Sequence, residues 1–175
     1  MDPPAKPLVV PSMALTTLFE TSEGRVGHSG PLLLTSMQES TTFGFLEALD
    51  RVQTKLIETW PKLSSINVMS HTNLKVDEQT RARGVALTDK FEKHGLATAI
   101  VVLSRGLSGV GVRTALSMYF MASRGGVPTK VFPSVAEGLS WLQTFPGQDQ
   151  LVKMLSPLDL EQFFTQPPVS QAAST

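Results

Sequence analysis

The pattern of apolar and polar residues predicts a βαβ unit over residues 96–142. Residues 97–103 are almost wholly apolar, which is typical of a parallel strand that is covered on both faces. A glycine-rich stretch, a helix over residues 111–123 and a short strand over residues 130–132 follow. A strand, a helix and a second strand in this order predict a parallel sheet covered by helices.

The N-terminal part of the chain predicts strands before its first helix. Residues 14–19 and 31–37 have the composition of strands, and they flank the polar, glycine-containing segment 21–30. This arrangement predicts a long hairpin or a meander, with residues 25–28 as a candidate part of its second strand. A further short strand is predicted over residues 66–70.

A long amphipathic helix is predicted over residues 42–60. Ser40 or Thr41 can cap its amino end, and Pro61 ends it because proline lacks the backbone N–H that continues a helix. One face of this helix is expected to be buried, since apolar residues recur at helical spacing. They are Phe45, Leu49, Val52, Leu56 and Trp60.

A second helix is predicted over residues 76–94, closed by Gly95 in the left-handed conformation. Gly84 lies in the middle of its inward face, where glycine costs ~1 kcal/mol relative to alanine. We interpret this glycine as the point at which the helix lies close on the sheet. The other inward positions are Val76, Thr80, Leu87 and Phe91.

The third helix, residues 111–123, has more apolar surface than a helix needs to cover a sheet. Its apolar residues span roughly 200° of the helical wheel, about twice the ~100° of a one-sided helix. Either the C-terminal segment or a second copy of the chain is expected to cover the excess. These apolar residues are Val112, Ala115, Leu116, Met118, Tyr119, Phe120 and Ala122.

The C-terminal part of the chain predicts short capped helices. Ser134 and Glu137 have the spacing of a capping box, in which each side chain bonds the other's backbone N–H. Residues 148–155 are expected to be helical. Pro157 then occupies the favoured first position of a last helix, which ends near Phe164.

Two segments of this chain resemble those of STAS-like modules, a family that includes anti-sigma factor antagonists and the cytoplasmic parts of sulfate transporters. They are GLSGVGVRTAL and VFPSVAEGLSWL, the second being a strand, a cap and a helix that ends in Trp-Leu. The resemblance covers residues 14–145. It implies a STAS-like α/β fold, with a mixed, largely parallel sheet flanked by helices. It also implies a bacterial, non-catalytic regulatory module that acts through protein contacts.

The length of 175 residues suits one domain with modest extensions. Both ends lack periodic apolar residues, so we expect them to be mobile. The expected organisation is a flexible segment over residues 1–12, a STAS-like domain over residues 13–145, a helical extension over residues 146–166 and a disordered tail over residues 167–175.

Composition narrows the classes of function. Fifteen basic residues balance fifteen acidic ones, and this neutrality argues against nucleic-acid binding, which needs a positive surface. Cysteine is absent, so thiolate chemistry is excluded. No apolar run approaches the ~20 residues that cross a bilayer, and the first residues lack the pattern of a secretion signal. We expect a soluble, cytoplasmic protein that does not insert into membranes.

The segment before the second helix is one candidate site. In STAS antagonists, a serine or threonine at this position is phosphorylated by a partner kinase. The corresponding residues here are Ser70, His71, Thr72 and Asn73, without the aspartate and glycine that are usual in that turn. The hydroxyls of Ser70 and Thr72 therefore either accept a phosphate, which a helix amino end tolerates, or cap the helix or satisfy backbone groups of the loop.

The glycine-rich stretch 105–111 is the second candidate site. Glycines between a strand and a helix let backbone N–H groups face an anion, and Arg105 and Arg113 could add charge. Ser108 and Gly109 lie in the same stretch. It matches neither the dinucleotide fingerprint nor the P-loop, so a simple tight turn is the alternative. The three histidines share no metal-ligand spacing, and no cofactor is expected.

Three hypotheses about function follow. The first is an interaction module that uses residues 70–73, the glycine-rich stretch and the third helix, where Met118 and Met121 suit an adaptable contact surface for a partner or a homodimer. The second is a binder of a small apolar or anionic molecule, with an apolar pocket between the third helix and the C-terminal helices for an acyl or isoprenoid chain. The third is an enzyme that acts on a phosphorylated substrate at the glycine-rich stretch.

Overall fold

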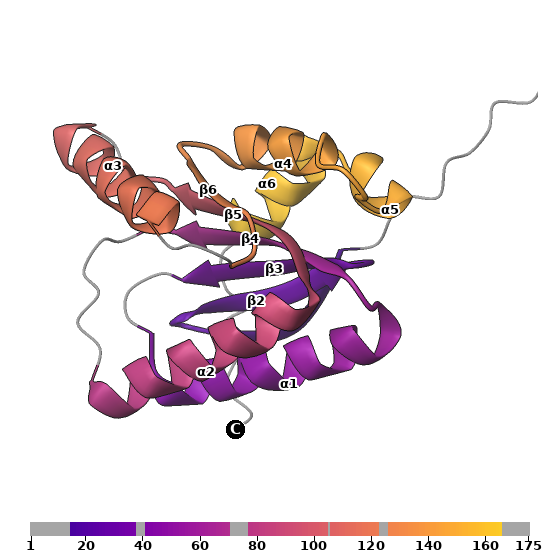
Figure 1. Cartoon of the computed structure of the whole chain (residues 1–175), viewed down its shortest axis with the longest axis horizontal. Coiled ribbons are helices and arrows are strands. Elements are labelled where there is room, and N and C mark those ends of the chain that lie inside the picture. Colours follow the sequence, from indigo (N-terminus) through magenta and orange to yellow (C-terminus); the bar gives the residue numbers. More distant parts are fainter. Residues whose placement is uncertain (1–14, 38–40, 71–76, 105, 123–125, 166–175) are drawn as a thin grey trace, which may run out of the picture.

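The computed structural model shows an α/β fold built on one six-stranded sheet (Figure 1). The residues that the structure describes are 15–37, 41–70, 77–104, 106–122 and 126–165, without the side chains of Leu107 and residues 119–122. The predicted end segments, residues 1–12 and 167–175, lie outside this description.

The sheet is mixed and mostly parallel, as the sequence predicts. Its first three strands form an antiparallel meander, so the predicted meander is confirmed and residues 25–28 belong to its second strand. The remaining strands add in parallel, in the same order as along the chain. The strands are β1 (Thr16–Thr21), β2 (Gly24–Ser29), β3 (Leu32–Met37), β4 (Leu63–Met69), β5 (Gly95–Val102) and β6 (Thr129–Phe132).

Helices cover both faces of this sheet. The pair α1 (Phe43–Thr59) and α2 (Glu78–His94) lies on one face, and the C-terminal helices lie on the other (Figure 1). The C-terminal helices are α4 (Val135–Gln143), α5 (Gln150–Lys153) and α6 (Pro157–Thr165). The predicted capping box of α4 is confirmed, since the Ser134 hydroxyl accepts a hydrogen bond from the Glu137 N–H at 3.2 Å. Pro157 begins α6, as predicted.

The cap of α1 lies one residue later than predicted. Thr42, rather than Ser40 or Thr41, accepts the hydrogen bond from the Phe45 N–H at 3.2 Å. Glu23 explains the choice, because its carboxylate accepts a hydrogen bond from the Thr42 hydroxyl at 2.5 Å and so fixes that side chain.

The prediction for Gly95 is wrong. Its backbone is extended, with φ −69° and ψ 136°, so no left-handed cap closes α2. Packing explains the glycine instead: an added Cβ would lie 2.4 Å from the Val127 Cγ2 and 2.7 Å from the Phe91 ring. At the other end of α2, Asp77 accepts hydrogen bonds from the Thr80 N–H and hydroxyl, and these bonds hold the pKa of Asp77 below its ordinary value.

The interpretation of Gly84 is also wrong. The nearest atom to a Cβ at this position would be the Leu46 Cδ1 on α1, at an ordinary contact distance of 3.9 Å. No sheet atom lies within that distance among the described residues. Gly84 therefore faces Leu46 of α1 rather than an atom of the sheet.

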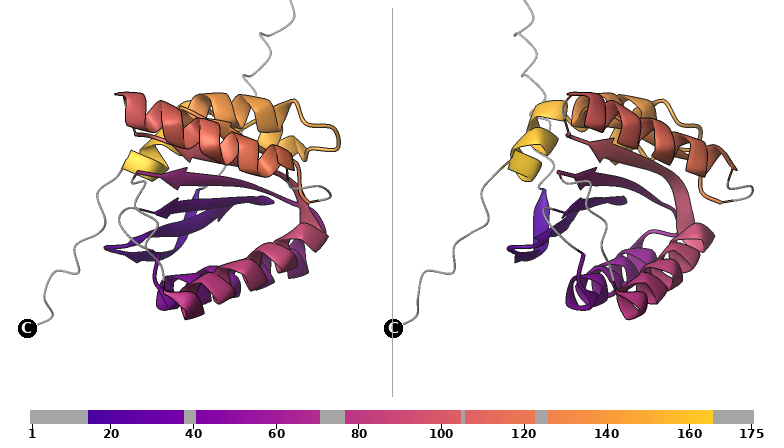
Figure 2. Two further views of the ribbon diagram at one scale, coloured as in Figure 1. Left: turned by 60° about the vertical axis from the view of Figure 1, so that its left-hand side comes forward. Right: turned by 90° about the vertical axis from the view of Figure 1, so that its left-hand side faces the viewer.

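The third helix, α3 (Gly106–Ala122), begins earlier than predicted, so the glycine-rich stretch is its first turns rather than a loop. Gly109 is required there, because a Cβ would lie 1.9 Å from the Ser104 carbonyl oxygen. Arg113 links the helix to the end of β5 and to the residue that follows shortly after it. Its Nη1 donates to the Val102 carbonyl at 3.2 Å and to the Ser104 carbonyl at 3.0 Å. In all three views α3 stands apart from α1 and α2 (Figures 1 and 2).

The C-terminal segment packs on α4 and the sheet. Leu160 and Phe163 belong to the apolar cluster that includes Leu34 and Leu139. The buried guanidinium of Arg25 on β2 donates to the Phe163 carbonyl and pairs with Glu20, which ties the end of α6 to the meander.

Candidate ligand-binding site

A partly enclosed pocket lies between the sheet and the α1–α2 pair. Its volume of about 400 Å³ falls within the range of small-ligand sites. The lining residues come from both helices, from β3 to β6 and from the segment before β6. They are Leu33, Thr35, Met37, Leu46, Leu49, Gln53, Ser65, Asn67, Gly84, Leu87, Thr88, Phe91, Glu92, Thr98, Ile100, Gly126, Val127 and Thr129.

The walls of this pocket are mainly apolar. Leu46 and Leu49 contribute from α1, and Leu87 and Phe91 from α2. Leu49 belongs to the predicted inward face of α1 and is half-buried: it lines the pocket and packs against the apolar cluster that includes Leu33. Gly84 adds no side chain at all, which widens the space between the two helices.

The floor of the pocket is polar. Ser65, Thr98 and Thr129 stand in register on β4, β5 and β6, and the Ser65 and Thr98 hydroxyls are hydrogen-bonded at 2.9 Å. Thr35 and Asn67 form a second registered pair on β3 and β4. The strand register thus gathers hydroxyl and amide groups from four strands on one face.

The opposite face of the same strands has no such polar groups at the equivalent central positions. Leu34, Ile66 and Ala99 stand in register there, and all three are fully buried under the C-terminal helices. Side chains of successive strand residues point to opposite faces. The hydroxyl and amide groups at these central positions therefore face the pocket, whereas Ser64 on the opposite face is bonded to Gln148.

Two lining residues carry buried polar atoms that lack a partner. The Gln53 Oε1 and the Thr35 Oγ1 have no hydrogen-bond partner among the residues that the structure describes. Gln53 is 4% exposed and Thr35 is 1% exposed. An unpaired buried polar atom costs about 1–3 kcal/mol, so these two atoms are sites where a bound molecule could supply the missing bond.

The rim of the pocket carries one negative charge. Among the described residues that line it, Glu92 alone is ionisable. Its carboxylate lies beside the backbone of Gly126, where an added Cβ would be 2.8 Å from the Glu92 Oε1. Thr88, one turn before Glu92 on α2, is exposed at the same rim.

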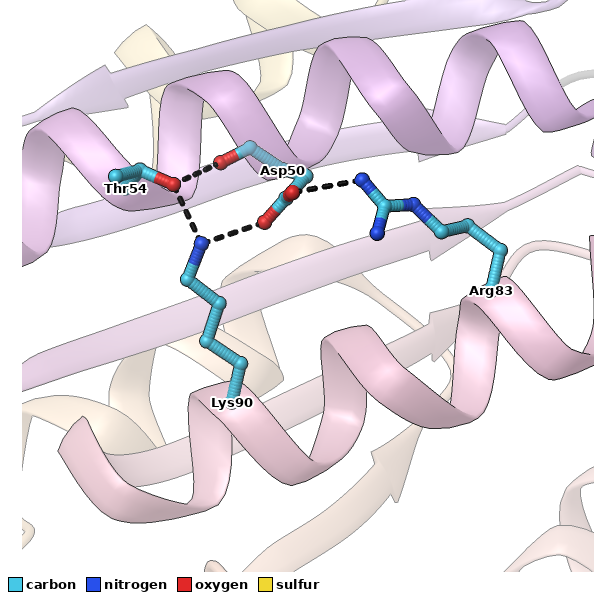
Figure 3. Close-up of polar contacts among 4 residues, drawn as sticks. All are labelled: Asp50, Thr54, Arg83 and Lys90. Atoms are coloured by element: carbon cyan, nitrogen blue, oxygen red, sulfur yellow. Dashed lines mark hydrogen bonds and ion pairs between the residues drawn. The ribbon is translucent and has the colours of Figure 1, made fainter.

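A polar clamp holds the two helical walls together. Figure 3 shows Asp50 and Thr54 on α1 facing Arg83 and Lys90 on α2. The Asp50 carboxylate accepts hydrogen bonds from Arg83 Nη2 at 2.7 Å and Lys90 Nζ at 2.6 Å. Partial burial opposes ionisation of Asp50, but the bonds and charges of Lys90 and Arg83 outweigh it and lower its pKa.

The predicted site residues are not gathered at this pocket. The Ser70 hydroxyl donates to the Met37 carbonyl at 3.1 Å, and Ser108 is exposed on α3. Arg113 Nη1 donates to two backbone carbonyls, and Gly109 lies within α3, so the predicted anion-binding role of these residues stays a prediction. Four predicted residues, His71, Thr72, Asn73 and Arg105, lie outside the described part of the chain, as does the side chain of Met121.

Met118 is exposed on α3, as an interaction surface would require. The pocket described here lies on the side of the sheet covered by α1 and α2, and the predicted pocket between the third helix and the C-terminal helices stays a prediction. Polar residues at alternate positions of otherwise apolar strands, such as Ser65 and Asn67, were the signal for it in the sequence. This pattern identifies a pocket only when the register between the strands is known, and a local sequence pattern does not give that register.

Comparison of the chain with protein-family models, with curated proteins and with solved structures finds no match. Within the described residues, no three histidine or acidic side chains gather where they could hold a metal ion. None of the helices described here combines the length and apolar character that crossing a bilayer requires.

Proposed function

We propose that this protein binds a small, mainly apolar molecule in the pocket between the α1–α2 pair and the sheet. One observation carries the proposal: a polar floor and two lining residues with unpaired buried atoms, Gln53 and Thr35, occur together around a cavity of about 400 Å³. Apolar walls with a few fixed polar groups are the usual composition of a ligand site.

Two tryptophan variants of α2 test this function. Thr88→Trp places a large ring at the rim of the pocket, and its exposed position lets the fold tolerate the change. Val85→Trp is the matched control, because Val85 is exposed on the same helix and does not line the pocket. Native mass spectrometry of the purified proteins should detect a bound small molecule in the wild type and the control.

The rim variant should show that adduct at less than about a tenth of the wild-type level, because the ring blocks the entrance. Titration with 1-decanol provides the same comparison if purification strips the ligand. Equal binding by both variants, or no binding by any of the three proteins, would refute the proposal.

A second candidate function is protein contact through α3, the role that the STAS-like resemblance implies. The observation that favours it is exposure: Val110 is 53% exposed and Met118 57% exposed on this helix. Exposed apolar groups that cluster on one surface are typical of interaction sites.

Truncation of this surface tests the second candidate. Met118→Ala combined with Met121→Ala should lower the mass measured by light scattering if α3 mediates self-association, or abolish capture of a partner protein in a pull-down. An unchanged mass together with an unchanged set of captured proteins would exclude α3 as the contact.

A further inference from the structure

The structure points to an uncharged ligand: we infer that the pocket takes an apolar molecule whose polar end is a hydroxyl group, rather than a fatty acid or another anion. This inference rests on the proposed ligand-binding function and adds the chemical class of the ligand. It is argued from charge, from hydrogen-bond capacity and from the position of the polar groups.

The charges of the pocket disfavour an anion. No lysine, arginine or histidine is among the described residues that line it; Arg83 and Lys90 on α2 do not line it, and both pair with Asp50. A carboxylate that left water for this pocket would lose its hydration without gaining a counter-charge. Glu92 at the rim would repel it as well.

The floor also disfavours a buried ammonium group. Its polar side chains are hydroxyls and amides, and none of them carries a negative charge. A cation that reached Gln53 or Thr35 would be desolvated without a carboxylate partner. Glu92 is exposed at the rim, so it could hold a cation only at the entrance.

A hydroxyl group matches the bonding capacity of the pocket's polar groups in both directions. The Gln53 Oε1 is an acceptor and needs a donor. The Ser65 and Thr98 hydroxyls share one hydrogen bond, which uses one of their two protons and leaves the other for an acceptor. A hydroxyl both donates and accepts, whereas a ketone or an ether can only accept.

The position of the polar groups gives the ligand its orientation. Gln53 on α1 and Thr35 on β3 carry the unpaired atoms, and both residues are almost fully buried where they line the pocket. The apolar side chains of Leu46, Leu87 and Ile100 offer hydrocarbon contact around them. The hydroxyl end therefore binds at the floor, and the apolar body lies between the helices and the sheet.

Three probes of equal chain length test this assignment on the full chain: 1-decanol, decanoate and decylamine. Affinities are measured by calorimetric titration at pH 8, below the concentrations at which the probes aggregate. We expect 1-decanol to bind at least ~tenfold more tightly than either charged probe, because only the alcohol reaches the floor without losing the hydration of a charge.

The outcomes separate this inference from the proposed function. Decanoate or decylamine binding as tightly as 1-decanol would overturn the inference and leave a ligand-binding pocket standing. Failure of all three probes to bind would overturn both.

Two variants locate the hydroxyl. Gln53→Leu should reduce the preference for 1-decanol over decanoate several-fold, and Thr35→Val serves as a second variant should Gln53→Leu fold poorly. Gln148→Leu is the control: this buried glutamine is bonded to Ser64 on the other face of the sheet, so the preference should persist. A preference unchanged in both pocket variants would contradict the inference.

Discussion

Gln53 and Gln148 are both buried glutamines, yet their surroundings differ. The Gln148 Nε2 donates to the Ser64 hydroxyl at 2.9 Å and to the Leu142 carbonyl at 3.0 Å. The Gln53 Oε1 has no partner in the described structure. Gln148 therefore stabilises the fold, whereas the Gln53 Oε1 lacks a hydrogen bond that a bound molecule would supply.

Replacing each glutamine by leucine should have opposite effects on stability. Gln148→Leu should lower the free energy of unfolding by about 1–3 kcal/mol, because Ser64 and the Leu142 carbonyl lose a partner. Gln53→Leu should leave it unchanged or raise it, because an unpaired buried amide is replaced by a side chain that needs no bonds. Urea denaturation of the unliganded proteins measures both free energies. An equal loss of unfolding free energy in the two variants would contradict the difference between the two glutamines.

Gly84 and Gly109, both within helices, make a second matched pair. Gly84→Ala should stabilise the protein by about 0.5–1 kcal/mol, since alanine favours the helix and its Cβ meets only Leu46 at 3.9 Å. Gly109→Ala should destabilise it, because its Cβ would lie 1.9 Å from the Ser104 carbonyl oxygen. Denaturation midpoints that shift in the same direction would show that one of these environments is wrongly described.

At the scale of elements, the α1–α2 clamp makes stability depend on pH. The pKa of Asp50 is lower in the fold than its ordinary value, because the bonds and charges of Lys90 and Arg83 outweigh the effect of burial. The carboxylate therefore contributes stability above its ordinary pKa, and this contribution disappears as the pH falls through the lowered value.

Asp50→Asn should cost about 0.5–1 kcal/mol at pH 7, a modest value because solvent screens these half-exposed partners. The difference between wild type and variant should stay constant from pH 6 to 8 and shrink below about pH 4, the ordinary range of a carboxyl pKa. Thermal unfolding across this range provides the measurement. A difference that grew on acidification would mean that Asp50 is not held ionised by its partners.

The elements themselves were largely predictable from the sequence. Apolar periodicity located α1 and α2, and capping chemistry located α4 and α6, because each signal acts over a few neighbouring residues. The start of α3 was not predictable in this way. Its glycines suggested a loop, but at least one of them, Gly109, is required by contact with the end of β5.

At the scale of the whole molecule, the pocket arises from register between distant strands. Thr35 and Asn67, or Ser65 and Thr98, are neighbours only because parallel strands align after long helical connections. The order of strands and helices along the chain was enough to predict the fold class, an α/β architecture with a mostly parallel sheet. The pocket could not be predicted from that order, because the side chains that line it are far apart along the chain.

Titration of isotope-labelled protein with 1-decanol, followed by two-dimensional NMR of the backbone amides, tests the ligand-binding account most directly. We predict saturable shifts at Gln53 on α1, Gly84 on α2 and Thr98 on β5, with α6 unaffected. Shifts confined to α3 or the C-terminal helices, or no saturable shifts at all, would contradict it.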